Sequence, residues 1–577
     1  MAGTYAELER LVGEIRDSMG AQVGNLWTKW SNERQSKIQE WLEVRNYVFA
    51  TDTRTTSNAD LPWKNSTTIP KICQIRDNLH ANYLSSLLPN DNWLRWIGDN
   101  EQDQAKARMI IAYMRDKAHQ SKLRDLLSKL VYDYIDFGMA FATAEYVKEE
   151  YVLPNGRTVL GYDGPVGIRI SPLDIVFNPI APTFAEAPKI IRSMKSLAEI
   201  KKLAETDERW KDAFSKTLKL RKSIGAFTVD DTYKAMGFSV DGFGNLQEYF
   251  GSQYVEVLTF KGDFYDPLTQ EAYSNQEIIV VDRCHTVYHG ENPSWLGKND
   301  ILAAGWRKRP DNLYCMGPLD NLIGMQYRID HLENLKADAM DLLVHPPLKL
   351  KGDVEPFEWG PGAVISIIGD GDVEEMGKGL QGVVSAQNEI ANLEMRMEEY
   401  AGAPKQAMGI RTPGEKTMYE VQSLENAAGR IFQEKITSFE VNMVEPLMNL
   451  YLAIGRDKFG SASTVKIFND QLGVEMFMTL QPEDLVANGT LRPIGARHFS
   501  EQAQLLQNLN QLFASPLGEM LKPHWSAEKT ALLVEDSMDL ARYGLVQKNI
   551  GLVEQAEMAD VSNHLNQVVA ERQAAPS

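Results

Sequence analysis

Two apolar stripes that flank a pair of prolines constrain the fold of this chain more than any other feature. The first stripe consists of Leu319, Leu322, Met325, Ile329, Leu332, Ala339 and Leu343. Its steps are three and four residues, with Lys336 filling the slot between Leu332 and Ala339, and they predict a helix that packs against other helices. His345-Pro346-Pro347 must end this helix, because proline lacks the amide donor and restricts the residue before it. The second stripe, with similar steps, is Val383, Ile390, Leu393, Met397 and Tyr400.

The segment between the stripes has the composition of a small β unit. PLKLKG and PFEWGPGAVISII are rich in strand formers and turn residues. The chain is therefore expected to form a helical hairpin with a β tip. Residues 370–375 resemble the start of a calcium loop, but Glu375 stands where a glycine is needed and Gln381 where the last glutamate is needed. We interpret this run as a solvated acidic turn.

A loop and a very long helix follow the second stripe. Residues 401–416 (AGAPKQAMGIRTPGEK) hold three glycines and two prolines, which predicts a mobile loop. Thr417 and Glu420 then have the spacing of a capping box at a helix start. The apolar face continues to about Gly455 or Gly460, and a bend is expected at Gly429, at Pro446, or at both.

The remaining segments predict an α+β protein. The chain reads as helical up to about residue 140, and period-two segments then alternate with Gly, Pro and Asn to about residue 290. These expected strands are FATAEYV, TVLGYDG, GIRISPLDIVF, YVEVLTFKGDFYD and EIIVVDR. A helical insert is expected over Leu197–Leu220. Strands return over 464–495 (TVKIF, MFMTLQPEDL, GTLRPIG), and helices are expected from Ser500 onward.

Composition narrows the possible functions. The chain has 577 residues and a net charge of −19, which argues against a static nucleic-acid coat because such a coat needs a basic surface. Three cysteines, Cys73, Cys284 and Cys315, are too few for a disulfide framework and suit a reducing compartment. The N-terminus lacks the apolar core of a signal peptide, and no apolar run approaches the ~18 residues that cross a bilayer. A soluble protein made in the cytoplasm is expected.

Motifs for catalysis are weak or missing. No P-loop, G-x-S-x-G, H-E-x-x-H or C-x-x-C pattern is present. Cys284, His285 and His289 lie close in sequence, but adjacent strand residues point to opposite faces, so structural packing is favoured over metal binding. Arg307-Lys308-Arg309 can contact phosphate or can form a solvated loop before Pro310.

The order of these parts resembles the portal (head-to-tail connector) proteins of tailed bacteriophages, in particular those of short-tailed phages. The stretches that resemble this family are GPVGIRISPLDIVFNPIAP (164–182), MGPLDNLIGMQYRIDHLENLKAD (316–338), HPPLKL with PGAVISI (345–367) and GIRTPGEKTMYEVQ (409–422). The similarity covers roughly residues 20 to 500, and its strength lies in the co-linear order.

The resemblance implies a portal-type fold with defined parts. These are a wing (1–316), a first stem helix (317–344), a clip (345–380), a second stem helix (381–401), a channel loop (402–416), a long kinked wing helix (417–460), further wing strands (461–500) and a helical crown (501–577). It also implies a dodecameric ring at one capsid vertex of the virion. Its channel would carry double-stranded DNA during packaging and ejection.

The resemblance further implies the partners and the site residues. The partners are the terminase packaging motor, which holds the ATPase, a tail adaptor, and the major capsid and scaffolding proteins. No catalytic residue, metal, cofactor or membrane contact is implied. Channel-loop residues that would contact DNA are Lys405, Gln406, Arg411 and Lys416. Clip residues for oligomerisation or adaptor docking are Lys349, Phe357, Trp359, Ile365 and Ile367. The apolar strand 363–368 is expected to pair with a neighbouring subunit, because an isolated tip leaves its edges open.

Charge gives this interpretation independent support. Acidic residues outnumber basic ones in both expected stem helices: Asp320, Asp330, Glu333, Asp338 and Asp341 in the first, and Glu389, Glu394, Glu398 and Glu399 in the second. The loop 402–416 is instead net basic. An acidic wall would repel the phosphate backbone, whereas a basic loop would hold it briefly. The alternative is that these acids are only the solvated face of the helices.

Two other classes of function stay open at this point. Another phage head or neck protein, such as a scaffold, neck or coat component, would need a helical hairpin without the β tip and without a channel loop. A nucleic-acid-processing enzyme would need a cluster of perturbed carboxylates or a metal site.

Overall fold

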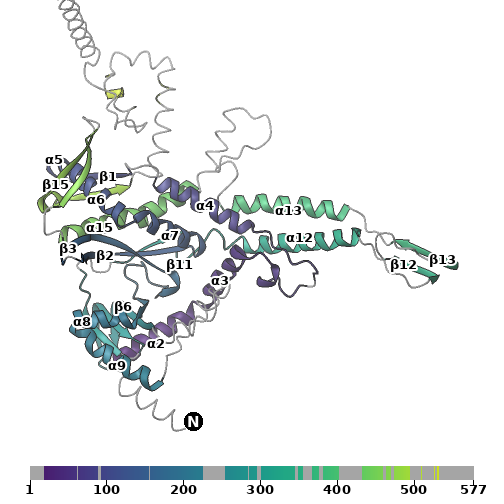
Figure 1. Ribbon diagram of the computed structural model, residues 1–577, viewed down its shortest axis with the longest axis horizontal. Coiled ribbons are helices and arrows are strands. Elements are labelled where there is room, and N and C mark those ends of the chain that lie inside the picture. The colour runs from purple at the N-terminus through teal and green to yellow at the C-terminus, as the bar shows by residue number, and fades with distance from the viewer. Residues whose placement is uncertain are drawn as a thin grey trace, which may run out of the picture. The chain divides into compact units, whose positions relative to one another are not determined.

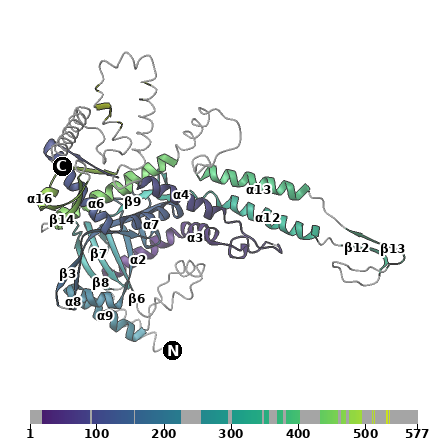
Figure 2. The same ribbon diagram turned by 45° about the horizontal axis from the view of Figure 1, so that its top comes forward.

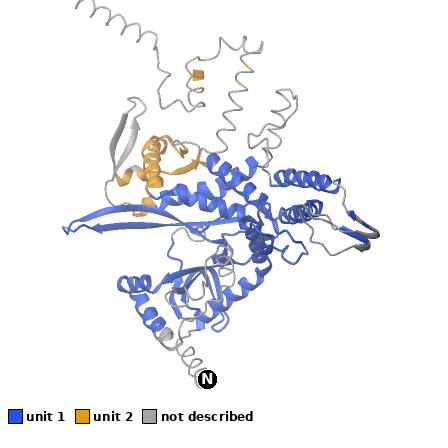
Figure 3. Ribbon diagram, turned by 45° about the vertical axis from the view of Figure 1, so that its right-hand side comes forward, with its two compact units in different colours: residues 1–86, 121–454 blue, residues 87–120, 455–577 orange. Residues whose placement is uncertain are grey.

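A computed structural model shows a chain of mixed helix and sheet (Figure 1), in agreement with the predicted α+β class. It describes residues 18–61, 63–88, 93–154, 156–224, 254–283, 285–294, 300–344, 348–354, 367–375, 381–401, 432–458, 463–469 and 474–493, with single positions between 509 and 534. The chain divides into two compact units (Figure 3), of which the larger holds residues 1–86 and 121–454. The smaller unit holds residues 87–120 and 455–577.

Helices of the larger unit follow the predicted apolar periodicity in most places. They are α2 (Ser18–Glu33), α3 (Gln35–Phe49), α4 (Lys71–Leu87), α7 (Leu123–Asp136), α8 (Leu197–Thr206), α9 (Glu208–Ile224), α12 (Ile323–Val344) and α13 (Gln381–Tyr400). The expected insert 197–220 is two helices that meet at Asp207. Ser196 begins the first of them with a complete capping box, in which its side chain accepts from the Glu199 amide.

Sheets of the larger unit are antiparallel. A five-stranded sheet has the order β4 (Ile175–Phe177), β5 (Lys189–Ser196), β6 (Tyr254–Asp266), β7 (Glu271–Val281) and β8 (His285–Glu291). A three-stranded sheet has the order β3 (Thr158–Ile170), β2 (Met139–Val152) and β9 (Leu302–Gly305). Strand β5 is absent from the sequence prediction, because its KIIRSMKS run carries five cationic or polar residues and only three apolar ones. Its place between β4 and β6 overrides that weak propensity.

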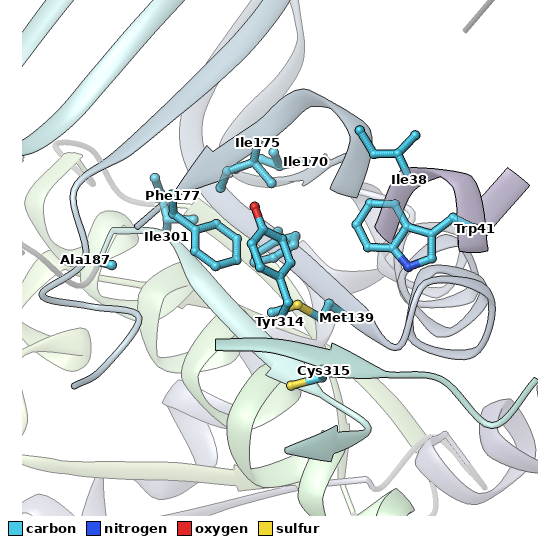
Figure 4. Packing of buried hydrophobic residues seen from close by; sticks show 11 residues of the cluster. Ile38, Trp41, Met139, Ile170, Ile175, Phe177, Ala187, Ile301, Tyr314 and Cys315 are labelled. Carbon is cyan, nitrogen blue, oxygen red and sulfur yellow. The ribbon is translucent and has the colours of Figure 1, made fainter. Parts of the chain in front are cut away.

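The core beside α3 links the two sheets of this unit (Figure 4). Trp41, Phe141, Phe177 and Tyr314 are buried there, and the rings of Phe177 and Tyr314 stack with their centroids 4.4 Å apart. Tyr314 belongs to the short hairpin β10 (Arg307–Arg309) and β11 (Asn312–Met316).

A buried guanidinium fixes the turn before β4. The Arg34 side chain donates to the carbonyl oxygens of Pro172 and Ile175 at 2.7 and 2.6 Å, and to that of Leu173 at 2.6 Å. Arg34, the residue before α3, therefore hydrogen-bonds the carbonyl groups of this turn in place of water.

The smaller unit contains one strand pair from distant parts of the chain and one pair of consecutive strands. Strand β1 (Leu94–Gly98) lies antiparallel to β16 (Gly489–Pro493), and β14 (Ser463–Asn469) to β15 (Val474–Leu480). Helices α5 (Glu101–Ala105) and α6 (Ala107–Gln120) belong to the same unit. The predicted strand 476–485 is partly wrong: it ends at Leu480, and Pro482–Leu485 form the helical turn α16. Proline is well suited to the first position of a helix, where no amide bond is needed.

The long helix that contains Pro446 is irregular close to that proline, where the sequence predicts a bend. Helix runs from Phe432 to Phe439, becomes a π-helical turn over Glu440–Val444, and resumes as α15 (Glu445–Lys458). Pro446 cannot donate to the carbonyl four residues earlier, which accounts for a widened turn at this point. The expected helix start at 417 and the loop 402–416 lie outside the described residues. Among the helices that the structure describes, none is long and apolar enough to cross a membrane.

Candidate functional site: the α12–α13 helix pair

Helices α12 and α13 run side by side in opposite directions (Figures 1 and 2). They contain 22 and 20 residues, close to the predicted helices. The side chains buried along the pair include Ile329, Leu332, Ile390, Leu393 and Met397, all predicted from the stripes. Tyr400 was predicted on the same face but is 62% exposed, so that prediction is wrong.

A two-stranded hairpin separates the two helices in sequence. Strands β12 (Leu348–Val354) and β13 (Ile367–Glu375) are antiparallel, and their register places Lys349 opposite Glu374 and Lys351 opposite Asp372. The Lys349 ammonium lies 3.4 Å from Glu374. The interpretation of residues 370–375 as an acidic turn is therefore wrong. They belong to strand β13, in which Asp372 and Glu374 lie opposite lysines of β12, a favourable cross-strand arrangement.

Few of the predicted site residues fall within the described segments. Lys349 is exposed on β12, and Ile367 is the first residue of β13. The others lie outside the described residues: Phe357, Trp359, Ile365, Lys405, Gln406, Arg411 and Lys416.

The main feature that sequence reasoning missed is a buried polar row on α12. Gln326, Asp330 and Asn334 follow one another at four-residue steps and have no exposed surface. This spacing places them on one helix face, toward the extended segment 64–70. The four-residue spacing of polar residues beside the apolar stripe was the signal that could have revealed this row.

Side chains of this row bond the backbone of the segment as a neighbouring strand would. Asn334 Oδ1 accepts from the Thr67 amide at 2.9 Å, and its Nδ2 donates to the Thr67 carbonyl at 3.0 Å. Gln326 Nε2 donates to the Ile69 carbonyl at 2.6 Å. These side chains add to the backbone bonds that the segment makes elsewhere, such as the one that the Ser66 carbonyl accepts from the Thr53 amide, and help to satisfy its polar groups.

Asp338 continues the row toward solvent. Its carboxylate accepts from the amides of Lys64 and Asn65 at 3.2 and 3.0 Å, and from Asn65 Nδ2 at 2.8 Å. Burial opposes ionisation, but the amides of Asn65 and Lys64 hold the pKa of Asp338 below its ordinary value. Asp338 is thus a charged anchor for the start of the segment.

The environment of Asp330 shifts its pKa in the opposite direction from that of Asp338. Its Oδ1 accepts from the Ile69 amide at 3.2 Å and from Gln326 Nε2 at 2.8 Å, and both donors are neutral. Burial raises its pKa to about 7, although these hydrogen bonds favour the charged form. The Asp330 carboxyl group therefore changes between its protonated and ionised forms near neutral pH.

One buried ion pair and one hydrogen bond tie α13 to other helices of the larger unit. Lys71, the first residue of α4, lies 2.7 Å from Glu398 of α13, and both side chains are buried. Lys336 of α12 reaches Gln387 Oε1 of α13 at 2.8 Å and pairs with Glu333 at 2.5 Å.

These contacts correct the charge argument made from sequence. Asp320 pairs with Lys37 at 2.8 Å, while Asp330, Asp338 and Glu398 hold the internal contacts just described. Several of the acids counted toward an acidic wall therefore serve packing instead. Glu389 and Glu399 of α13 stay exposed.

Large apolar side chains stand exposed on the same helix pair and hairpin. They are Tyr327, Leu335, Met340, Leu342, Val344, Leu350, Val384, Met395 and Tyr400. Val344 at the end of α12 is 70% exposed. Exposed apolar side chains that form a contiguous patch are typical of an interaction surface.

The two histidines of the candidate metal site make contacts with other side chains of the larger unit. His285 and His289 lie on β8, where His289 packs edge-on against Tyr273 and His285 Nε2 lies 3.7 Å from Asp212. Cys284 lies outside the described residues. Within the described segments, no group of three or more His, Cys, Asp or Glu residues could hold a metal ion.

A comparison of the sequence with models of known protein families gives no match, and a search of curated proteins gives none either.

Proposed function

We propose that this chain is the subunit of a portal ring of a tailed bacteriophage. The observation that carries the proposal is the α12–α13 pair, with the β12–β13 hairpin between its helices and exposed apolar side chains along it. The β tip favours this proposal over a scaffold or coat component, whose helical hairpin is expected to lack one. The exposed apolar side chains of this hairpin favour contact with another protein, and a second copy of the chain can provide that contact in a symmetric assembly.

Each part of the chain then has a proposed role. Helices α12 and α13 act as the stem, β12 and β13 belong to the clip, and residues 402–416 form the channel loop. The two compact units contribute the wing and crown. Twelve copies form a ring at one vertex of the virion, which passes double-stranded DNA and docks the packaging motor and the tail adaptor. Capsid and scaffolding proteins surround it, and the chain itself performs no catalysis.

Imaging of the purified protein tests this proposal. Negative-stain electron microscopy and mass photometry at micromolar concentration should show closed rings with a central hole and a mass near twelve subunits of 65.0 kDa. A monodisperse 65.0 kDa species at physiological salt would contradict the proposal. Rings that hydrolyse ATP or cleave DNA without added proteins would contradict its non-enzymatic part.

The loop gives a second, functional test. Replacing Lys405 and Arg411 by Ala should leave rings intact and reduce the retention of packaged DNA, because phosphate contacts of a basic loop are weak and salt-dependent. Lower thermal stability with unchanged packaging per ring would instead assign these cations to the following helix.

A further inference from the structure

A cavity of the larger unit is lined by residues of α2, α3, β4 and the β10–β11 hairpin. Its volume is about 160 Å³. Trp30, Phe177 and Pro179 supply apolar surface to it, and Tyr314 stacks on Phe177 with the ring centroids 4.4 Å apart (Figure 4). A cavity of roughly this volume can hold one aromatic ring, such as benzene. The cavity therefore has room for the apolar body of a small molecule.

A buried positive charge without a carboxylate partner also lines the cavity. Arg34 is 5% exposed, and its hydrogen bonds to the turn before β4 all go to neutral carbonyl groups. Burial lowers the pKa of its guanidinium, although nearby Asp174 acts in the opposite direction. Asp174 accepts from Arg192 at 2.8 Å, and Arg34 forms no ion pair within the described segments. Because buried charges are normally paired, an anion beside Arg34 would be stabilised.

Two buried donors at this place lack an acceptor. Arg34 Nε and the Tyr314 hydroxyl form no hydrogen bond within the part of the chain that the structure describes. Tyr314 is 8% exposed, and burial raises its pKa while the charge of Arg34 opposes that shift, so the two side chains are neighbours. A buried donor without an acceptor costs free energy. One ligand that carries an anionic oxygen group could accept from both donors.

The other charged residues of the lining do not compensate the buried charge. Lys37 and Glu40 pair with each other at 2.7 Å. Glu33 and Arg309 are exposed and of opposite sign, and neither forms an ion pair among the described residues. Water screens exposed charges far more than buried ones. The buried guanidinium of Arg34 therefore dominates the field inside the cavity.

We propose that this cavity binds a small organic carboxylate. The carboxylate would accept from Arg34 Nε and from the Tyr314 hydroxyl, while Arg309 adds positive charge from the exposed side. The apolar body of the ligand, about the size of one aromatic ring, would lie against Trp30 and Phe177. All of these residues belong to one chain, so the site does not depend on the proposed ring.

Benzoate is the probe for this site, because it joins a carboxylate to one aromatic ring. Isothermal titration calorimetry of the full chain should show saturable binding with a Kd below ~1 mM. Benzamide has nearly the same shape but no charge, and it should bind roughly tenfold more weakly. Equal binding of the two compounds would show that the cavity selects only for apolar shape, which overturns the proposal.

Arg309→Gln removes an exposed cation of the lining and should weaken benzoate binding roughly fivefold. Lys308 offers the matched control, because it is exposed on the same strand but does not line the cavity. Lys308→Gln removes the same charge and should change the affinity by less than about twofold. Equal losses in the two variants would reflect net charge alone and would contradict a bound carboxylate beside Arg309.

Tyr314→Phe should weaken benzoate binding about fivefold, because the ligand loses a hydrogen bond. Without ligand, this variant should melt at the temperature of the wild type or above it, since it removes a buried hydroxyl that has no partner. Tyr265→Phe, at an exposed tyrosine outside the cavity, should alter neither property. A lower melting temperature with unchanged benzoate affinity would assign the Tyr314 hydroxyl to the fold and overturn its proposed role.

Inorganic phosphate distinguishes a carboxylate site from a general anion site. It should displace benzoate only at a concentration roughly tenfold higher, because it leaves the aromatic walls of the cavity unused. Displacement at equal concentration would mean that the cavity holds an adventitious ion only, which overturns the inference. The absence of saturable binding up to ~10 mM benzoate overturns it as well. Imaging tests the proposed ring separately, so the failure of one proposal leaves the other standing.

Discussion

The inner and outer halves of the α12–α13 pair differ in which polar and apolar side chains they bury or expose. In the inner half, Gln326, Asp330 and Asn334 are buried, and Glu398 is buried against Lys71. In the outer half, Met340, Leu342 and Val344 of α12 are exposed, as is Val384 of α13. Polar groups are thus buried beside Ile329 and Met397 at the inner end, and large apolar side chains are exposed at the outer end of α12.

This difference separates what the chain completes by itself from what it leaves to a partner. Buried polar groups are tolerated in the inner half because segment 64–70 and Lys71 satisfy them. In the outer half the start of the same segment bonds Asp338 and Asp341, but the apolar side chains of Met340, Leu342 and Val344 stay exposed among the described residues. Substitutions in the inner half should therefore act on the folding of the single chain, and those in the outer half on association.

Glu398→Ala should have the largest effect on folding. It leaves the Lys71 ammonium buried without its carboxylate, which typically costs ~3–5 kcal/mol. Urea denaturation at a concentration below assembly measures the loss. The double variant Lys71→Met with Glu398→Leu removes both charges and should recover most of the stability. A loss below ~1 kcal/mol for Glu398→Ala would show that the pair is effectively solvated.

Asn334→Ala should cost less, ~1–3 kcal/mol, because the Thr67 amide and carbonyl lose the side chain that bonds both of them at a partly buried site. Hydrogen exchange should rise in segment 64–70 before it rises elsewhere. Asn388→Ala, at an exposed position of α13, is the matched control and should change neither property. Equal exchange in both variants would mean that the row does not hold the segment.

Sequence reasoning recovered the helices of this pair but not the way they are held. Ile329, Leu393 and Met397 repeat at helical spacing, and that period alone predicts a buried face. Asp330 and Glu398 were read as surface acids, since their burial depends on Lys71 and on segment 64–70, far away in sequence. Strand β5 was missed for a similar reason, because its two neighbouring strands and not its own residues make it a strand.

The pH dependence of stability separates two acids of the same row. An unfolded aspartate ionises near pH 3.9, whereas buried Asp330 ionises at about 7. Between these values the native state holds a proton that the unfolded state releases, so the free energy of unfolding falls as pH rises from about 4 to about 7. Asp330→Asn should flatten this slope and be at least as stable as wild type at pH 8. Thermal melts from pH 5 to pH 8 measure it.

Asp338→Asn is the control of opposite sign. The pKa of Asp338 is held below its ordinary value, so its contribution is present above about pH 4 and is lost as pH falls. This variant should be less stable than wild type at both pH 5 and pH 8. If Asp330→Asn behaves in the same way, Asp330 is ionised in the native state at neutral pH.

Met340→Ser with Leu342→Ser should have the smallest effect on the single chain. Both side chains are already exposed, so their replacement removes little packing and should change the free energy of unfolding by less than ~0.5 kcal/mol per position. If the outer half meets a neighbouring copy, the same change removes apolar area from that interface. The concentration for half-assembly, measured by mass photometry, should then rise at least tenfold.

Leu393→Ser sharpens this last test, because Leu393 lies on the buried face of the same helix pair. That variant should lose ~2–4 kcal/mol of folding stability through the cavity and the buried hydroxyl. The two variants should therefore dissociate folding from assembly: one chain folds poorly, and the other folds normally but associates poorly. If the outer variant assembles like wild type, the exposed apolar side chains of α12 face solvent in the assembled state. The contrast between the two halves would then carry no information about partners.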